Sequence, residues 1–393
     1  MITATRGMFA LSGDPLTYGH LDVIRRALTE CNELVVLIAN NGGKAGRYLF
    51  TLSERVAIAE RAVRECGLAG QVRVTSSDGL LFDEFLKEDC SLLFRGIRNN
   101  VDRAYEEEQL GLMRLFTNAL PPERVRYIEA TSELAAVSSS MVKAAVAAGL
   151  DVERFVPLFV KALLEERILG QYKIGITGEM ASGKTYVARS LAETLTARGI
   201  PALVVNFDEL QRTLYREASS AGTKIRQNLS ERFGTSVLTD DQQDVRRDVL
   251  KTKIFAAETT AVMRAELHQL VAPHIFRLYR EAIRNHRGVI LIEWAQLAEG
   301  NLGHLVNNNV IVVEADSESR EAFAAKRNLS TADRLAVKKH QLSANEKIAL
   351  LSKQIEADSF GQVFHYHNQV GNNASITELA HEVANLFHLT IKE

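Results

Sequence analysis

The sequence predicts an α/β protein built from two doubly wound parallel-sheet domains in series. The chain has 393 residues, more than one hydrophobic core usually supports. In both halves, short apolar runs of β-rich composition alternate with amphipathic segments of helical spacing, the pattern of parallel βαβ units. Neither an internal repeat nor a low-complexity segment relates or separates the halves, so we expect two folds joined by a short connector.

The N-terminal half predicts strands and helices in alternation. Residues 7–11 and 34–39 are short apolar runs typical of strands, and residues 52–66 have apolar side chains at helical spacing. A charged helical stretch at 161–168 ends at Gly170, a plausible helix stop, and a new strand begins at 172. We therefore predict a first domain at 1–160, a linker helix and junction at 161–171, and a second domain at 172–393.

The C-terminal half is again α/β. We expect a helix at 185–198, a strand at 202–205, a long helical stretch to about residue 287, and strands near 289–292 and 310–313.

Composition limits the kinds of partner. Apolar residues at 46% and charged residues at 24% are ordinary for a globular protein, and the net charge of −2 gives no general attraction to nucleic acid or to an anionic membrane. Any anionic ligand must then be held by local groups. Three cysteines without CxxC spacing fit a reducing compartment, and no apolar run approaches the roughly 18 residues that span a bilayer. We expect a cytoplasmic protein that binds neither nucleic acid nor membranes.

The segment that follows the first predicted strand, residues 12–20, has the features of a phosphate-binding loop. Its small residues allow close backbone approach, and a helix opens behind it, so unpaired N–H groups and the helix dipole favour an anion there. Thr17, Gly19 and His20 have the TxGH spacing of nucleotidyltransferases, in which the histidine donates to a phosphate oxygen. This spacing by itself leaves the substrate open.

Two more segments resemble phosphopantetheine adenylyltransferase. The run Arg95-Gly96-Ile97-Arg98, with Asp102, Tyr105 and Glu106 after it, is similar to that family's RGLR…DxEYE stretch, and residues 137–143 are similar to its ISSSLVK stretch. Arginines supply paired donors to phosphates, and serines at a helix start supply hydroxyl and backbone donors. With TxGH, the three motifs cover about 160 residues in the family's order, which implies a Rossmann-like nucleotidyltransferase domain.

The resemblance implies in-line attack of the pantetheine phosphate on the α-phosphorus of ATP, without a covalent enzyme intermediate. His20 would stabilise the charge that develops on the α-phosphate, and Ser12 would orient the attacking phosphate. Lys44 and Arg95 would bind the pantetheine phosphate, and Leu81 would line the pantetheine arm. The residues implied in ATP binding are Gly13, Thr17, His20, Gly96, Arg98, Glu106, Ser138, Ser139 and Ser140.

Each of these residues also has an ordinary structural reading. Arg95 and Arg98 could pair with Asp102 and Glu106 on the surface, although an RGxR run directly after an apolar strand lies where such sheets place ligands. Lys44 could be a solvated loop lysine. The family usually has threonine where this chain has Ser12, and an aromatic residue where it has Gly13.

The second strong motif is a P-loop. Residues 178–185 form a complete GxxxxGK[ST] between a predicted strand and a predicted helix, which is the context that this motif requires. Backbone N–H groups would hold the β-phosphate, Lys184 would neutralise the β and γ oxygens, and the Thr185 hydroxyl would ligate Mg²⁺. The residues expected to contact ATP here are Gly178, Ala181, Ser182, Gly183, Lys184 and Thr185.

The rest of this half resembles dephospho-CoA kinase over about 200 residues, and so implies a P-loop kinase domain. Asp208 stands where that family has its proposed base for the attacking ribose hydroxyl, and Arg327 stands where its lid has an arginine. Further similar runs occur at 247–255 and 267–275. Asp208 could otherwise be a helix cap. Glu293, an acid at a strand end, could complete the Mg²⁺ shell through water.

The resemblance to dephospho-CoA kinase has departures. Asn206 replaces the first aspartate of the family's DAD segment, Ala272 replaces its HP histidine, and its late IDN(S/N)G segment reads YHNQVG at 366–371. Groups that would recognise the acceptor therefore differ more than those that would bind the nucleotide.

Together the motifs resemble a bifunctional CoA synthase that converts 4′-phosphopantetheine to dephospho-CoA and then to CoA. ATP would be the co-substrate of both steps, Mg²⁺ the cofactor, and the other partners small molecules. We also expect a homo-oligomer, since adenylyltransferases of this type commonly assemble. Two alternatives stay open: a nicotinamide mononucleotide adenylyltransferase fused to a ribosylnicotinamide kinase, and an adenylyltransferase with a regulatory P-loop domain.

Overall fold

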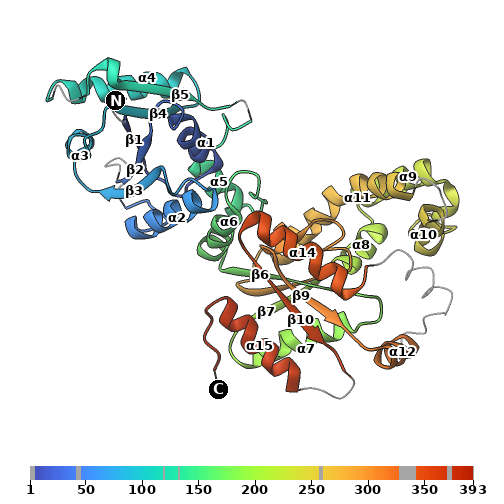
Figure 1. Cartoon of the computed structure of the whole chain (residues 1–393). Helices are drawn as coiled ribbons and strands as arrows, with labels where there is room; N and C mark the ends of the chain where they lie inside the picture. Colours follow the sequence, from blue (N-terminus) through green and yellow to red (C-terminus); the bar gives the residue numbers. More distant parts are fainter. Residues whose placement is uncertain are drawn as a thin grey trace. The chain divides into compact units, whose positions relative to one another are not determined.

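The computed structural model describes residues 5–40, 46–117, 120–131, 133–255, 260–326, 342–369 and 374–392. It divides the chain into two compact units, Met1–Leu169 and Gly170–Glu393, each of which has its own sheet (Figure 1). The residues predicted as a junction, 161–171, divide between the units, because α6 (Leu158–Leu164) and the π-helical turn after it belong to the first. Among the described residues no helix is both long and apolar enough to cross a membrane.

The first unit is a five-stranded parallel sheet in the order β3-β2-β1-β4-β5. Its strands are β1 (Arg6–Leu11), β2 (Glu33–Ala39), β3 (Val72–Ser77), β4 (Leu92–Ile97) and β5 (Val125–Glu129). Its helices besides α6 are α1 (Tyr18–Ala27), α2 (Leu52–Glu65), α3 (Leu81–Lys87), α4 (Asn100–Arg114) and α5 (Ser139–Ala147). This arrangement confirms the doubly wound parallel sheet.

The strand order of the first unit reverses between β1 and β4. The chain builds outward from β1 through β2 to β3, and then returns to place β4 on the other side of β1. Strand β2 is buried on both faces, which agrees with its unbroken apolar run LVVLIA in the interior of a parallel sheet. In open α/β sheets ligands bind beyond the carboxyl ends of the strands at such a switch point. The loop after β1 and the RGxR run of β4 both lie there.

The second unit is another parallel sheet of five strands, in the order β10-β9-β6-β8-β7. Its strands are β6 (Gln171–Gly178), β7 (Ala202–Asn206), β8 (Gly288–Glu293), β9 (Asn309–Glu314) and β10 (Gln362–His367). Its helices are α7 (Lys184–Ala197), α8 (Phe207–Arg216), α9 (Ser220–Phe233), α10 (Arg247–Phe255), α11 (Thr260–Ile283), α12 (Ser317–Lys326), α14 (Ala344–Asp358) and α15 (Ala374–Leu386).

Two apolar cores cover the two faces of the second sheet. One joins α7 and α15 to the face that carries Val289 and Leu291, and the other joins α8 to α11 and α14 to the face that carries Ile290 and Ile292. Figure 1 shows α7 and α15 together. Alternate residues of β8 thus enter different cores, which explains why its sequence is apolar throughout.

The long helical stretch predicted up to residue 287 consists of four helices, α8 to α11, in the described residues. Helix α9 ends at Gly234, whose φ of +87° glycine adopts without strain and other residues do not. An isolated β-bridge between Leu238 and Val245 follows. The edge strand β10 was not predicted at all.

Candidate active sites

The loop between β1 and α1 orients the ring of His20. The backbone N–H of Thr17 donates to Nδ1 of His20 over 3.0 Å, and Thr17 Oγ1 lies 3.0 Å from the same nitrogen. Because Nδ1 accepts, the proton of the neutral ring resides on Nε2. The TxGH spacing therefore has a local structural reason: threonine ends the loop, and the histidine three residues later presents Nε2 as its donor.

Arg55 holds the backbone of the same loop in place. This side chain of α2 is only 1% exposed, and its Nη1 donates to the carbonyl oxygen of Ser12 over 2.7 Å. Its guanidinium also bonds Asn40 and lies 4.1 Å over the ring of Tyr48. Sequence reasoning missed Arg55, although a charged residue among apolar positions of a helix was a usable signal. Because the guanidinium holds the carbonyl group of Ser12, we regard Arg55 as a positioning residue.

The serine motif contacts the loop through its own side chains. Ser139 Oγ donates to the carbonyl oxygen of Pro15 over 2.8 Å, and Lys143 Nζ pairs with Asp14 at 2.5 Å. The Asp14 carboxylate is buried and also accepts from the backbone N–H groups of Leu49 and Phe50. The first and third motifs, which lie about 125 residues apart in sequence, therefore form one structure.

Two ion pairs engage the arginines of the second motif. Arg95 Nε donates to Glu106 over 2.6 Å, and Arg95 Nη1 donates to the carbonyl oxygen of Ala10 in β1 over 3.1 Å. Arg98 forms a two-point pair with Asp102 at 2.7 and 3.0 Å, which holds the pKa of that carboxyl below its ordinary value. The surface pairing considered from sequence is thus present, and Arg95 lies beside β1 at the switch point as well.

Five more predicted residues of the first site are described next. Ser138 caps α5, since its Oγ accepts from the N–H of Met141 over 3.1 Å, and Ser140 is exposed in the first turn. Leu81 begins α3 and packs against the core. Gly96 has a packing reason, because a Cβ there would lie 3.0 Å from Val23 of α1. Lys44 lies outside the described residues.

The P-loop of the second unit is tightly packed against the sheet. A Cβ on Gly178 would lie 2.2 Å from the carbonyl oxygen of Val313, so only glycine fits there. Lys184 Nζ donates to the carbonyl oxygens of Glu179 and Gly178 over 2.7 and 3.1 Å, and thus lies across the loop. Ser182 Oγ is buried with no hydrogen-bond partner in the described part of the chain. Such a group is costly unless a ligand satisfies it.

A chain of hydrogen bonds links the P-loop helix to the neighbouring strands. Thr185 Oγ1 donates to Glu293 Oε1 over 2.7 Å, and Asn206 Nδ2 donates to Glu293 Oε2 over 2.6 Å. Glu293 is 6% exposed at the end of β8, the strand beside β6. A buried carboxylate next to a hydroxyl is an oxygen donor set that suits Mg²⁺. Asn206 stands where the dephospho-CoA kinase family has an aspartate. Its amide donates a hydrogen bond to Glu293, whereas an aspartate at this position would repel the Glu293 carboxylate.

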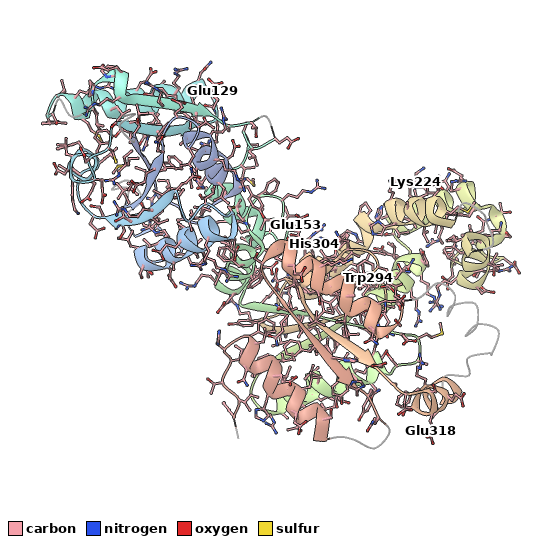
Figure 2. The ribbon with its side chains drawn as sticks, viewed as in Figure 1. Glu129, Glu153, Lys224, Trp294, His304 and Glu318 are labelled. Carbon is pink, nitrogen blue, oxygen red and sulfur yellow. The ribbon has the colours of Figure 1, made fainter. Side chains whose placement is uncertain are left out.

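Asp208 is exposed in the first turn of α8. The cap of this helix is Asn206, whose Oδ1 accepts from the N–H of Glu209 over 3.0 Å, so the helix-cap reading of Asp208 is wrong. Trp294, labelled in Figure 2, follows Glu293 and stacks on Phe207 with ring centroids 4.4 Å apart. These aromatic rings fix the start of α8, and with it the position of Asp208.

Three arginines interact electrostatically, and sequence reasoning missed the group. They are Arg212 and Arg216 of α8 and Arg247 at the start of α10, and Asp208 also acts on Arg247. Burial, followed by the positive charges of Arg212 and Arg216, lowers the pKa of the Arg247 guanidinium, while Asp208 and Asp244 oppose the shift. Arg216 Nε also donates to Asp244 over 2.6 Å. Like charges that gather in this way favour an anion. The side chains come from α8 and α10, which are about 30 residues apart in sequence, so only the fold brings them together. Arg327, the predicted lid residue, lies outside the described residues.

Comparison with known proteins agrees with both resemblances. Residues 172–360 match the dephospho-CoA kinase family, and residues 12–145 match the cytidylyltransferase-like family. Phosphopantetheine adenylyltransferase of Clavibacter michiganensis subsp. michiganensis is 40% identical over 160 residues, which cover 40% of this chain and 94% of that protein. The enzyme of the same name from Brucella anthropi is 34% identical over 166 residues, covering 42% of this chain and 98% of that protein.

Proposed function

Because the chain belongs to the phosphopantetheine adenylyltransferase family in its N-terminal part and matches dephospho-CoA kinase after it, we propose that its two units catalyse consecutive steps of coenzyme A biosynthesis. The first unit transfers the adenylyl group of ATP to 4′-phosphopantetheine and releases pyrophosphate. The second transfers the γ-phosphate of ATP to the 3′-hydroxyl of the resulting dephospho-CoA and releases ADP. Both reactions consume ATP, and we propose that they take place in the cytoplasm.

In the first step a phosphate oxygen of phosphopantetheine attacks the α-phosphorus while the bond to the β-phosphate breaks. His20 donates from Nε2 to the α-phosphate as negative charge develops on it, a role supported by the Thr17 bond to Nδ1. Ser12 orients the attacking phosphate from a loop that Arg55 holds. Arg95 binds the pantetheine phosphate together with Lys44, and Arg98 binds ATP. Since both described arginines already pair with carboxylates, phosphate binding exchanges or shares these partners.

In the second step Asp208 accepts the proton of the 3′-hydroxyl as its oxygen bonds to the γ-phosphorus. Lys184 leaves the loop carbonyls to bind the β and γ oxygens, and Ser182 Oγ gains the partner that it lacks. Thr185 and Glu293 would hold Mg²⁺, which when bound neutralises phosphate charge. The cluster of Arg212, Arg216 and Arg247 binds phosphate groups of dephospho-CoA beside the base.

The observation that supports the proposal most is the His20–Thr17 bond at the switch point, since it prepares an N–H donor where the triphosphate must lie. The choice of acceptor tests it. Purified full-length protein with ATP should release pyrophosphate with 4′-phosphopantetheine and not with nicotinamide mononucleotide. The reverse preference would select the nicotinamide alternative.

We predict that Asp208→Asn lowers the conversion of dephospho-CoA to CoA by at least about a hundredfold, because loss of a general base commonly costs that much. The fold should persist, since Asp208 is exposed and Asn206 caps the helix. CoA formation is measured with the full-length protein. Glu209→Gln, which neutralises the adjacent exposed carboxylate, serves as the matched control and should change turnover by less than about threefold. Equal effects of the two substitutions would reject Asp208 as the base.

We propose that copies of the chain associate through α4. Val101, Tyr105 and Leu112 recur at helical intervals along it, and each is more than half exposed, as are Leu115 and Phe116 just after it, at 77% and 82%. Exposed apolar residues grouped along one helix in this way mark an interface far more often than scattered ones do. We propose that a second copy of the chain covers this surface, in agreement with the homo-oligomer expected from the sequence.

We predict that Phe116→Asp lowers the molar mass measured by light scattering at micromolar concentration, because a carboxylate cannot be buried without a partner. Leu86→Asp, which alters an exposed leucine of α3, should leave the mass unchanged. If both variants keep the mass of the unaltered protein, or if that protein is monomeric, the α4 interface is excluded.

A further inference from the structure

A group of three potential metal ligands lies at the end of the edge strand β10. His365 and His367 are two residues apart on this strand, so their side chains lie on the same face of the sheet. Both residues are exposed, whereas their neighbours Phe364 and Tyr366 are buried. Glu314 is the last residue of β9 and pairs directly with His367 in the strand register. Within the described residues, this is the one group of three histidine, cysteine or acidic side chains whose ligand atoms lie within 4.8 Å of one another.

The distances between the nitrogen and oxygen atoms of these three side chains are close to those between the ligand atoms around a bound metal ion. His365 Nε2 lies 2.7 Å and His367 Nδ1 3.6 Å from the same oxygen, Glu314 Oε2. With metal–ligand bonds of about 2.0–2.2 Å, ligand atoms of a tetrahedral site lie about 3.3–3.6 Å apart. The His367 contact already has this length, and the His365 contact needs to open by less than about 1 Å. The imidazole rings are adjacent, with centroids 4.2 Å apart.

We propose that Glu314, His365 and His367 form a binding site for a divalent transition metal of the Zn²⁺ type. Two imidazole nitrogens with one carboxylate suit Zn²⁺, Ni²⁺ or Cu²⁺, whereas Mg²⁺ prefers oxygen ligands alone. The site is therefore chemically distinct from the Mg²⁺ position assigned to Thr185 and Glu293. Glu314 and His365 are one-third exposed and His367 63%, which leaves room for water at the open positions.

The place of the site in the fold connects it to the P-loop. Asn368, directly after His367, is 3% exposed; its N–H donates to the carbonyl oxygen of Glu314 over 2.8 Å. The side-chain Nδ2 of Asn368 donates to the carbonyl oxygen of Ser182 in the P-loop over 2.9 Å. A metal that joins β9 to β10 thus ties the edge strand to the sheet beside the residue that braces the P-loop. We assign the metal a structural role, the stabilisation of this edge.

Equilibrium dialysis of full-length, tag-free protein against Zn²⁺ tests the proposal. His365→Ala and His367→Ala should each remove one equivalent of bound Zn²⁺, or weaken its binding at least about tenfold, the smallest cost expected when even an indirect partner of a ligand is lost. His381→Ala, which removes an exposed histidine of α15, is the control and should bind as the unaltered protein does. If the cluster variants bind the same number of Zn²⁺ ions with the same affinity as the control, the site does not exist.

Thermal unfolding and hydrogen exchange report the structural role. At about one hundred times its Kd, Zn²⁺ should raise the unfolding midpoint of the second unit by about 5–10 °C, and Mg²⁺ should not reproduce this rise. Backbone N–H groups at 362–368 should exchange more slowly with Zn²⁺ present in the unaltered protein and not in Glu314→Gln. Equal exchange with and without Zn²⁺ in the unaltered protein would overturn the assignment.

Discussion

Lys184→Ala is expected to reduce the formation of CoA from dephospho-CoA by at least about a thousandfold. Removal of one neutral hydrogen-bond donor that stabilises a transition state lowers turnover about 10²–10³-fold. Lys184 carries a full positive charge that would stabilise the phosphoryl group during its transfer. Lys184 Nζ donates to the carbonyl oxygens of Glu179 and Gly178, both within the loop itself, and we expect the P-loop to stay folded when these bonds are lost. The measurement is the rate of CoA release from dephospho-CoA and ATP.

The first reaction is the internal control for this variant. Dephospho-CoA formation from phosphopantetheine should continue at the normal rate in Lys184→Ala, because the two sites are built from separate stretches of chain. Loss of both activities in a folded variant would instead indicate a shared or coupled site.

His20→Ala is expected to reduce adenylyl transfer by about 10²–10³-fold while ATP binding stays within about tenfold. A donor directed at charge that develops only in the transition state contributes roughly 2.7–4 kcal/mol there and little to the ground state. The half-buried ring caps a turn with Thr17, and its removal should affect stability only slightly. Pyrophosphate release measures turnover, and calorimetric titration measures ATP affinity.

In His20→Ala the kinase reaction serves as the control, so the two variants test each other. CoA formation from added dephospho-CoA should be normal in this protein. Near-normal adenylyl transfer would mean that His20 is structural and that the assignment of the first site is wrong.

The parts of the molecule that sequence predicted well are those encoded by short contiguous runs. The loop after β1 with Thr17 and His20, and the P-loop from Gly178 to Thr185, each lie between a strand and a helix, as the sequence predicts. The parallel sheets followed from apolar runs such as β2, which are buried on both faces. Local spacing is enough to predict these turns, because the strand, the loop and the helix are consecutive in the sequence.

The features that sequence missed depend on contacts between distant segments or on weak patterns. Strand β10 alternates exposed and buried residues and carries two histidines, so it lacks the apolar run that marked its neighbours. The cluster around Arg247 unites residues of two helices. Arg55 reaches the Ser12 carbonyl from 43 positions away. Residue spacing in the sequence does not show which distant side chains meet, because the fold topology brings them together.

We propose that one chain makes CoA from 4′-phosphopantetheine in two steps, each at its own site. The decisive measurement is a time course with full-length protein, ATP, Mg²⁺ and 4′-phosphopantetheine, in which dephospho-CoA and CoA are separated and quantified. We expect dephospho-CoA to appear first and CoA to follow, Lys184→Ala to stop at dephospho-CoA, and His20→Ala to make CoA only from added dephospho-CoA. Accumulation of dephospho-CoA without any CoA, in the unaltered protein, would rule out the second step.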